Sequence, residues 1–136
     1  MILDSIKEQF KKKGFWKTIE FYFCRVMSKA ALKVVGTYAA NHGKLHRNYI
    51  VFKNRTMQDM TDNARAFFEY LVHNEAYKNY QIIWMVSDKR KFRKCKYKNV
   101  KFVTAESRNG WTSPLAYYYG SVSGFFFYTN NTAYLN

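Results

Sequence analysis

The sequence is poor in acidic residues, proline and cysteine, and it contains no long hydrophobic run. It holds 9 acidic residues against 23 basic ones, which gives a formal net charge of +14 over 136 residues. A single proline and an aromatic content of 20% exclude a disordered basic tail, because such tails have few aromatic residues. No stretch of about eighteen uncharged apolar residues occurs, so we expect no membrane-spanning helix. The length suits one domain with a single core.

Cysteine usage gives no sign of a disulfide or a zinc site. Cys24 and Cys95 lie far apart in unrelated contexts, which is typical of reduced thiols. The N-terminus has its lysines after the first apolar residues and lacks a cleavage site, so it does not resemble a secretory signal peptide.

No residue pattern indicates catalysis, and we predict no metal site. His42 and His46 have the spacing of helical metal ligands, but Gly43 lies between them and no third ligand follows. His73 is expected on the surface. No glycine-rich phosphate loop of the GxGxxG or GxxxxGK[ST] type occurs, and no serine, histidine and acid pattern suggests a nucleophile.

The positive charge is concentrated in two places. Residues 1–33 contain eight basic and three acidic side chains, and residues 89–101 contain eight basic side chains and no acidic one. Residues 109–136 carry no charge, and the apolar run 125–128 is typical of a strand covered on both faces. We therefore expect a piece of a longer protein.

The first 35 residues have helical periodicity, with a break at Gly14. One interpretation is a helix packed on its own core. We favour an interfacial helix, in which aromatic side chains enter the acyl boundary and lysines contact anionic headgroups. The expected membrane contacts are Phe10, Lys11, Lys12, Lys13, Phe15, Trp16, Lys17, Phe21 and Phe23. Residues 36–48 have two glycines and no period, which predicts a linker.

From residue 49 the pattern alternates between strands and helices. Short apolar runs predict strands at 49–52, 80–86, 100–104 and 124–128. Helices are predicted at 62–74, with Asp62 as N-cap, and from Pro114 to about residue 121. This order favours an α/β fold with a mostly parallel sheet and helices on its faces.

The basic run at 89–101 has three interpretations. Phe92 and Tyr97 could stack on nucleic acid bases between the charges. The run could instead join the N-terminal helix in one membrane-facing patch. We favour a solvated loop between two strands.

The unit from residue 50 to 88 resembles the CDP-glycerol glycerophosphotransferases, which build teichoic-acid-type polymers. The resemblance lies in an apolar strand, a loop, a helix and a second strand. The matching residues are Asp62, Asn63, Phe68, Glu69, Tyr70, Leu71, Tyr80, Ile82, Ile83 and Trp84. Residues 99–131 resemble the family's next strand, its tyrosine-rich helix and a strand ending in asparagine. Ala64 stands where the family usually has proline.

The resemblance implies a GT-B enzyme, of which residues 49–136 are an incomplete, Rossmann-like, acceptor-side domain in the N-terminal half. CDP-glycerol would be the donor substrate of the complete enzyme, and the chain itself would need no cofactor. A histidine of that enzyme would act as general base on an acceptor hydroxyl. The family's Trp-His-Gly motif is absent here, so the fragment is expected to be inactive.

The resemblance also implies partners and a location. They are an anionic membrane surface, a lipid-linked polyol-phosphate acceptor and the missing C-terminal part of the enzyme, at the cytoplasmic face of the plasma membrane. Residues near strand ends are the candidates for binding the acceptor: Asn54, Arg55, Arg65, Asn130 and Asn131. For the two arginines, ordinary surface positions are an equally good interpretation. The alternative function is a non-catalytic basic module that binds anionic membrane or nucleic acid, although we do not expect nucleic acid.

Overall fold

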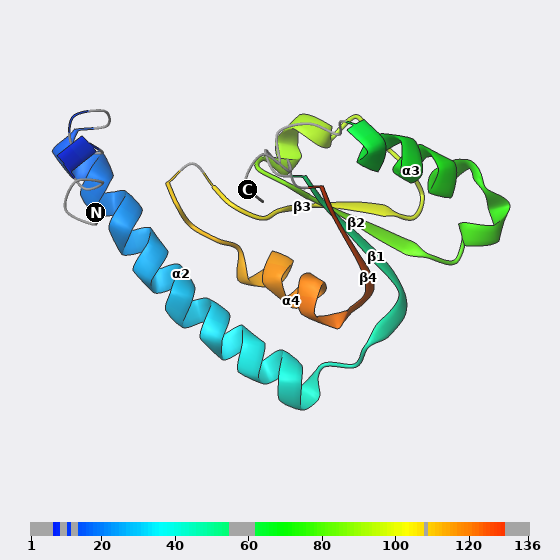
Figure 1. The fold of residues 1–136 in the computed structure, drawn as a ribbon, viewed down its shortest axis with the longest axis horizontal. Helices are drawn as coiled ribbons and strands as arrows, with labels where there is room; N and C mark the ends of the chain where they lie inside the picture. Colours follow the sequence, from blue (N-terminus) through cyan, green and yellow to red (C-terminus); the bar gives the residue numbers. More distant parts are fainter. Residues whose placement is uncertain (1–6, 9–10, 12–13, 55–61, 108, 130–136) are drawn as a thin grey trace, which may run out of the picture.

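The structure, a computed structural model, describes residues 7–8, 11, 14–54, 62–107 and 109–129 (Figure 1). Its elements in chain order are α2 (Phe15–His42), β1 (His46–Asn54), α3 (Asp62–His73), the 3₁₀ turn η1 (Glu75–Tyr77), β2 (Gln81–Val86), the 3₁₀ turn η2 (Lys89–Phe92), β3 (Val100–Thr104), α4 (Pro114–Val122) and β4 (Ser123–Thr129).

The four strands form one parallel sheet in the order β3-β2-β1-β4. In the centre, Val51 of β1 lies opposite Ile83 of β2 on one side and Phe126 of β4 on the other. The predicted α/β class with a parallel sheet is confirmed. Because all strands run the same way, their carboxyl ends meet at one edge of the sheet. We call this the carboxyl edge.

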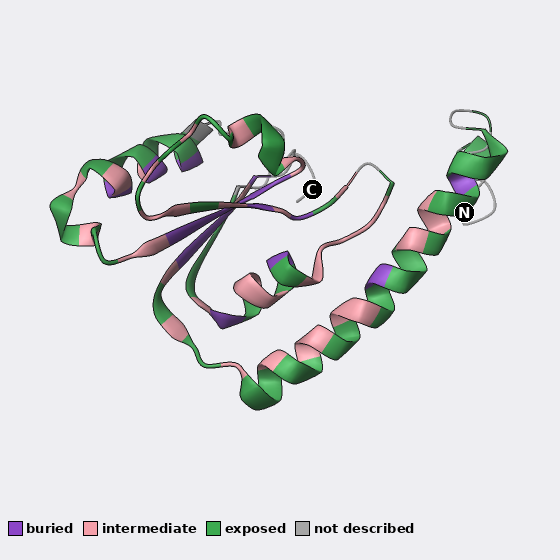
Figure 2. Ribbon diagram, turned by 180° about the vertical axis from the view of Figure 1, so that it is seen from behind, coloured by how far each residue is buried: buried purple, intermediate pink, exposed green. Residues whose placement is uncertain are grey.

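Apolar side chains of the strands alternate between two cores, as the two-residue period of a strand requires. The core under α3 contains Ile50, Phe52, Ala64, Phe68, Leu71, Ile82, Trp84 and Val86. The core under α4 contains Val51, Ile83, Met85, Val103, Ala105 and Ala116. Figure 2 shows the buried residues concentrated in the sheet between these helices. Burial on both faces explains why β1 and β2 have nearly continuous apolar sequences.

Local sequence signals determine the start of α4. The Ser113 side chain accepts a hydrogen bond from the backbone N–H of Ala116 at 3.4 Å, and Pro114 occupies the first turn. A proline is favourable there because its missing N–H has no partner in the helix. The predicted start is therefore confirmed.

Helix α2 lies alongside α4, on the side away from the sheet (Figure 1). Thr18 and Ser28 are its buried residues. Several large apolar side chains are exposed, with exposed fractions between 43% and 78%, whereas others such as Phe21, Leu32 and Val35 are half-buried. We call the exposed ones the outer face of α2: Phe15, Trp16, Ile19, Phe23, Val26, Met27, Val34 and Tyr38. A helix that covers a core ordinarily has the opposite arrangement.

The predicted linker at 36–48 is wrong in its local structure. Helix α2 continues to His42 and β1 begins at His46, so only three residues separate them. The helix continues because this segment packs on α4. Gly36 lies against the ring of Tyr117, where an added Cβ would come within 3.4 Å of that ring.

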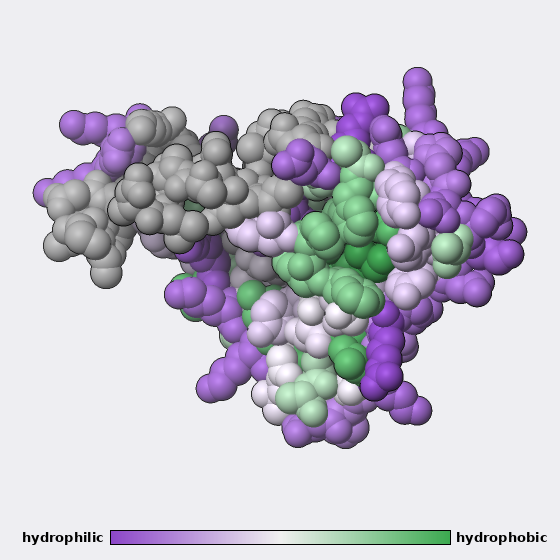
Figure 3. Space-filling model, turned by 45° about the vertical axis from the view of Figure 1, so that its right-hand side comes forward, coloured by the Kyte–Doolittle hydropathy of each residue, from purple (hydrophilic) through white to green (hydrophobic). Residues whose placement is uncertain are grey.

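Strand β4 forms one edge of the sheet, and large side chains are exposed along it. The exposed fractions of Phe125, Phe126, Phe127 and Tyr128 lie between 43% and 52%. Figure 3 shows a hydrophobic area on one face of the molecule, with hydrophilic side chains to its right. No helix in the part of the chain that the structure describes has the length and hydropathy to cross a membrane.

Candidate functional site at the carboxyl edge of the sheet

Among the described residues, two cavities lie along the carboxyl edge. In open parallel sheets this edge is where ligands bind, because the connecting loops diverge there and leave a crevice. A third cavity, of about 680 Å³, lies at the opposite edge, between Asn48 and Asn99. We therefore take the two cavities at the carboxyl edge as the candidate site.

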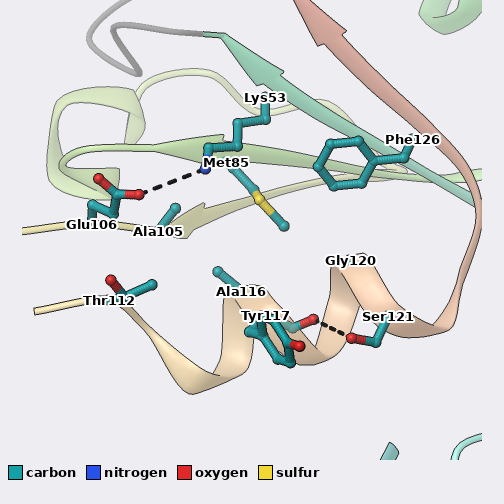
Figure 4. A pocket seen from close by; sticks show the side chains of 10 residues that line it. All are labelled: Lys53, Met85, Ala105, Glu106, Thr112, Ala116, Tyr117, Gly120, Ser121 and Phe126. Atoms are coloured by element: carbon teal, nitrogen blue, oxygen red, sulfur yellow. Dashed lines mark hydrogen bonds and ion pairs between the residues drawn. The ribbon is translucent and has the colours of Figure 1, made fainter. Parts of the chain in front are cut away.

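The first cavity, here called the α4 cavity, has a volume of about 330 Å³ and lies between the sheet and α4 (Figure 4). Its lining residues are Lys53, Met85, Ala105, Glu106, Thr112, Ala116, Tyr117, Gly120, Ser121 and Phe126. Figure 4 shows Met85 and Phe126 extending from the sheet toward α4. Most of this lining is apolar, so the interior suits a hydrocarbon group better than a charged one.

An ion pair lies beside this apolar space. Nζ of Lys53, from the end of β1, is 3.6 Å from Oε1 of Glu106, which follows β3. The Lys53 side chain is 28% exposed and that of Glu106 is 47% exposed. A half-exposed pair contributes little to stability, because water screens it. An anionic group of a ligand can therefore replace the Glu106 carboxylate as the partner of Lys53.

The second cavity, here called the β3 cavity, has a volume of about 670 Å³ and a polar lining. It lies between the η2 turn and the loop after β3. Its lining residues are Ser87, Asp88, Lys89, Arg90, Lys91, Thr104, Ser107 and Asn109. Hydroxyl, amide and cationic groups thus surround one space, which suits an anionic, hydroxyl-bearing ligand.

The carboxylate in the β3 cavity is already paired. Nε of Arg90 donates to both Asp88 oxygens at 3.0 and 3.2 Å, and Nη2 donates to Oδ2 at 2.9 Å. The Asp88 side chain also accepts the backbone N–H of Arg90. The side-chain hydrogen bond from Arg90, followed by this backbone hydrogen bond, lowers the pKa of Asp88 to about 2. The charges of Asp88 and Arg90 thus cancel, and the positive charges of Lys89 and Lys91 remain in excess in the lining of the cavity.

The structure separates the predicted acceptor-binding residues. Asn54 is buried at the end of β1. Arg65 lies on the exposed surface of α3, and its Nε donates to Oε1 of Glu69 at 2.9 Å. This hydrogen bond to Glu69 raises the pKa of Arg65. Neither residue lines one of the two cavities. Arg55, Asn130 and Asn131 lie outside the described residues.

The predicted membrane contacts differ in their exposure to solvent. Phe15, Trp16 and Phe23 belong to the outer face of α2, and Lys11 and Lys17 are exposed. Phe21 is half-buried and points toward Gly110, where an added Cβ would come within 2.8 Å of its ring. Phe10, Lys12 and Lys13 lie outside the described residues.

The histidines have ordinary aromatic and backbone neighbours. His42 stacks on Tyr38, and His46 stacks on Tyr49 with ring centroids 4.4 Å apart. Nδ1 of His73 lies 2.8 Å from the carbonyl oxygen of Glu69. Within the described ranges, no three or more histidine, cysteine or acidic side chains come together as a metal site would require.

The residues that line the cavities were missed at the sequence level. Lys53 directly precedes the predicted Asn54, and the alternation of β1 places its side chain on the α4 face with Val51. If the alternation of the predicted strand is continued by one residue beyond Phe52, it predicts that the Lys53 side chain lies on the same face as Val51. Glu106, Ser107 and Asn109 carry no local signal, because only the topology brings their loop beside β1 and the η2 turn.

Comparison with known protein families gives a match over the central part of the chain. The family model described as CDP-glycerol:poly(glycerophosphate) glycerophosphotransferase matches residues 37–119. No curated protein and no solved structure matches the chain significantly. The matched range spans most of the parallel sheet, α3, the β3 cavity and the start of α4. Because this match covers more than half of the 136 residues, the chain belongs to the CDP-glycerol:poly(glycerophosphate) glycerophosphotransferase family.

Proposed function

We propose that this chain is part of the acceptor-side half of a glycerophosphotransferase with GT-B architecture. The enzyme would transfer glycerol phosphate from CDP-glycerol to a membrane-linked, teichoic-acid-type acceptor at the cytoplasmic face of the plasma membrane. The observation that carries this proposal is the family match over residues 37–119, which coincides with an open parallel sheet. The two cavities at the carboxyl edge supply space for an acceptor beside cationic side chains.

The chemistry of this transfer needs a base and a positioned acceptor. The acceptor hydroxyl oxygen attacks the phosphorus that carries glycerol, a new P–O bond forms, and CMP leaves with the electrons of the broken bond. The base takes the hydroxyl proton. Positioning and neutralisation of phosphate charge supply much of the rate enhancement in such reactions. The role of this chain would be to hold the acceptor, while the base and the donor site lie in the C-terminal part of the enzyme.

The outer face of α2 supports a location at the membrane. Its eight large apolar side chains lie on one side of the helix, and Lys29 and Lys33 are exposed on the same helix. Burial of such a face in the acyl boundary contributes about 25 cal/mol per Å² of apolar surface. Lysines near anionic headgroups add roughly 1 kcal/mol each.

Two experiments test the proposal. The chain alone, incubated with CDP-glycerol and a glycerol phosphate acceptor, should release no CMP, because the Trp-His-Gly motif is absent. Turnover by the purified chain would contradict the assignment to the acceptor side alone.

Vesicle flotation tests the membrane location. The chain should float with vesicles rich in phosphatidylglycerol, and the double variant Trp16→Ser/Phe23→Ser should lose most of this binding. Tyr70→Ser is the matched control, since Tyr70 is 54% exposed but lies on α3, across the sheet from α2. Equal flotation of all three proteins would rule out the outer face of α2 as the membrane contact.

A further inference from the structure

The segment that follows β2 concentrates positive charge beside the β3 cavity. Residues 89–98, here called the basic turn, contain seven basic residues and no acidic one. All seven side chains belong to exposed residues: Lys89, Arg90, Lys91, Arg93, Lys94, Lys96 and Lys98. Such a density of like charge is self-repulsive, so its arrangement requires anchoring by the rest of the fold.

Three contacts hold the basic turn against β3 and α3. The backbone N–H of Lys89 donates to Oγ1 of Thr104 at 3.1 Å. Phe92 stacks on Phe102 of β3, with centroids 4.9 Å apart and planes at 10°. The Tyr97 ring meets Phe68 of α3 edge-on at 5.3 Å. The charges are therefore displayed from an anchored segment, which lowers the entropy lost when a ligand binds.

These same ring contacts argue against nucleic acid as the ligand. Binding of single strands commonly relies on aromatic rings on which the bases stack. Phe92 and Tyr97, the aromatic residues of the basic turn, instead pack against the core under α3. What the turn offers to a ligand is a series of ammonium and guanidinium groups. This favours a polymer that is recognised through its phosphates.

The cations of the basic turn have few internal partners. Among the described residues, Arg90 is the member of the turn that forms an ion pair, with Asp88. Lys89 and Lys91 line the β3 cavity without such a pair in that part of the chain. The opposite wall carries Ser107 and Asn109, whose side chains hydrogen-bond to each other. Nδ2 of Asn109 also reaches Oε1 of Glu20 on α2 at 3.4 Å.

We propose that the β3 cavity and the basic turn bind the phosphodiester backbone of a polyol-phosphate chain, with Lys89 and Lys91 as phosphate ligands. The hydroxyl groups of Ser87 and Thr104 would contact the polyol hydroxyls between phosphates. This inference rests on the proposed function and adds to it the subsite that holds the acceptor polymer.

Fluorescence anisotropy with a labelled synthetic oligo(glycerol phosphate) tests the subsite. The double variant Lys89→Ala/Lys91→Ala should weaken binding by about tenfold or more, since it removes two charge-assisted contacts. Lys94→Ala/Lys96→Ala is the matched control. It removes the same charge from the same turn, but outside the lining of the cavity, and should cost less than about threefold. Equal losses in the two variants would overturn the assignment to the cavity.

Two further measurements separate the remaining outcomes. Amide chemical shifts of the unmodified chain, recorded with the oligomer, should change at 87–91 and 104–109, which needs no variant to fold. Tighter binding of an oligodeoxythymidine of equal charge would overturn the preference for polyol phosphate. Because these assays contain neither donor nor vesicles, their failure would contradict the subsite alone, whereas CMP release and flotation test the proposed function.

Discussion

Oγ of Ser28, in the middle of α2, accepts a hydrogen bond from the backbone N–H of Thr112 at 2.9 Å, across 84 positions of sequence. The same hydroxyl donates to the carbonyl oxygen of Cys24 at 2.7 Å. A buried serine thus uses both its donor and an acceptor site. The bond fixes α2 against the loop that lines both cavities, because Thr112 lines the α4 cavity and Asn109 lines the β3 cavity.

Replacement of Ser28 by alanine should therefore destabilise the chain. The N–H of Thr112 would lose its partner, and an unsatisfied buried donor costs about 1–3 kcal/mol. Urea denaturation measures this loss. Thr37→Ala is the control, because Thr37 bonds to its own helix at Lys33 and is exposed. A Ser28→Ala midpoint equal to that of Thr37→Ala would show that the bond does not contribute.

Gly110 should tolerate alanine less well than Gly14. Both have a positive φ, of 83° and 80°, and a side chain in such a conformation costs about 1–3 kcal/mol. At Gly110 a Cβ would also come within 2.8 Å of the Phe21 ring, whereas nothing lies within 4 Å at Gly14. Gly110→Ala should thus be the less stable variant in thermal unfolding, by about 1–3 kcal/mol of additional overpacking. The opposite order would contradict the packing of α2 on this loop.

Trp84 should be replaceable by phenylalanine but not by alanine. Its ring stacks on Phe52 at 4.9 Å and meets Phe68 edge-on at 5.1 Å. Among the buried polar side-chain atoms of the described residues, its Nε1 lacks a hydrogen-bond partner. Replacement of tryptophan by phenylalanine therefore removes the desolvation penalty of a buried donor that has no partner. In urea unfolding, Trp84→Phe should cost less than about 1.5 kcal/mol and Trp84→Ala about 3–5 kcal/mol. A cost of Trp84→Phe as large as that of Trp84→Ala would contradict this expectation.

The pairing of Asp88 with Arg90 should give a measurable acid titration. A pKa of about 2, below the ordinary 3.8, means that the folded chain binds this proton less readily than the unfolded chain. The resulting stabilisation is present above pH 3.8 and is lost as the pH falls toward 2. Carbon-detected NMR titration should give this pKa, and Arg90→Ala should raise it. Lys91→Ala should change it less, because Lys91 acts only through its charge. An unchanged pKa in Arg90→Ala would contradict the pairing.

Several elements could be predicted because their signals are local. The strand Val100–Thr104 and the start of α4 at Pro114 agree with the sequence prediction residue for residue. A continuous apolar run, a hydrophobic alternation and a serine before a proline can each be recognised from residues that are neighbours in the sequence. These signals were sufficient for the fold class.

The residues that α2 buries against the rest of the fold, and the residues that line the cavities, could not be predicted in this way. Hydropathy treats Thr18 and Ser28 as surface residues, yet both are buried, and their burial is tolerated because their hydroxyls donate to backbone carbonyls one turn earlier. Its position near a strand end predicts that Arg65 binds the acceptor, but Arg65 forms an ion pair with Glu69, four residues further along its own helix. Lys53 and Glu106 come together only because the end of β1 and the loop after β3 both lie at the carboxyl edge, which depends on strand order.

That strand order also gives the molecule an electrical direction. The described residues of β4, at one edge of the sheet, carry no charge, whereas the basic turn and β3 at the other edge together carry eight basic side chains. The chain is therefore a permanent dipole across its strands. Near a polyanion such as the proposed acceptor, it experiences a torque that turns the β3 edge toward that polyanion before contact, and dissolved salt weakens this torque within about 10 Å.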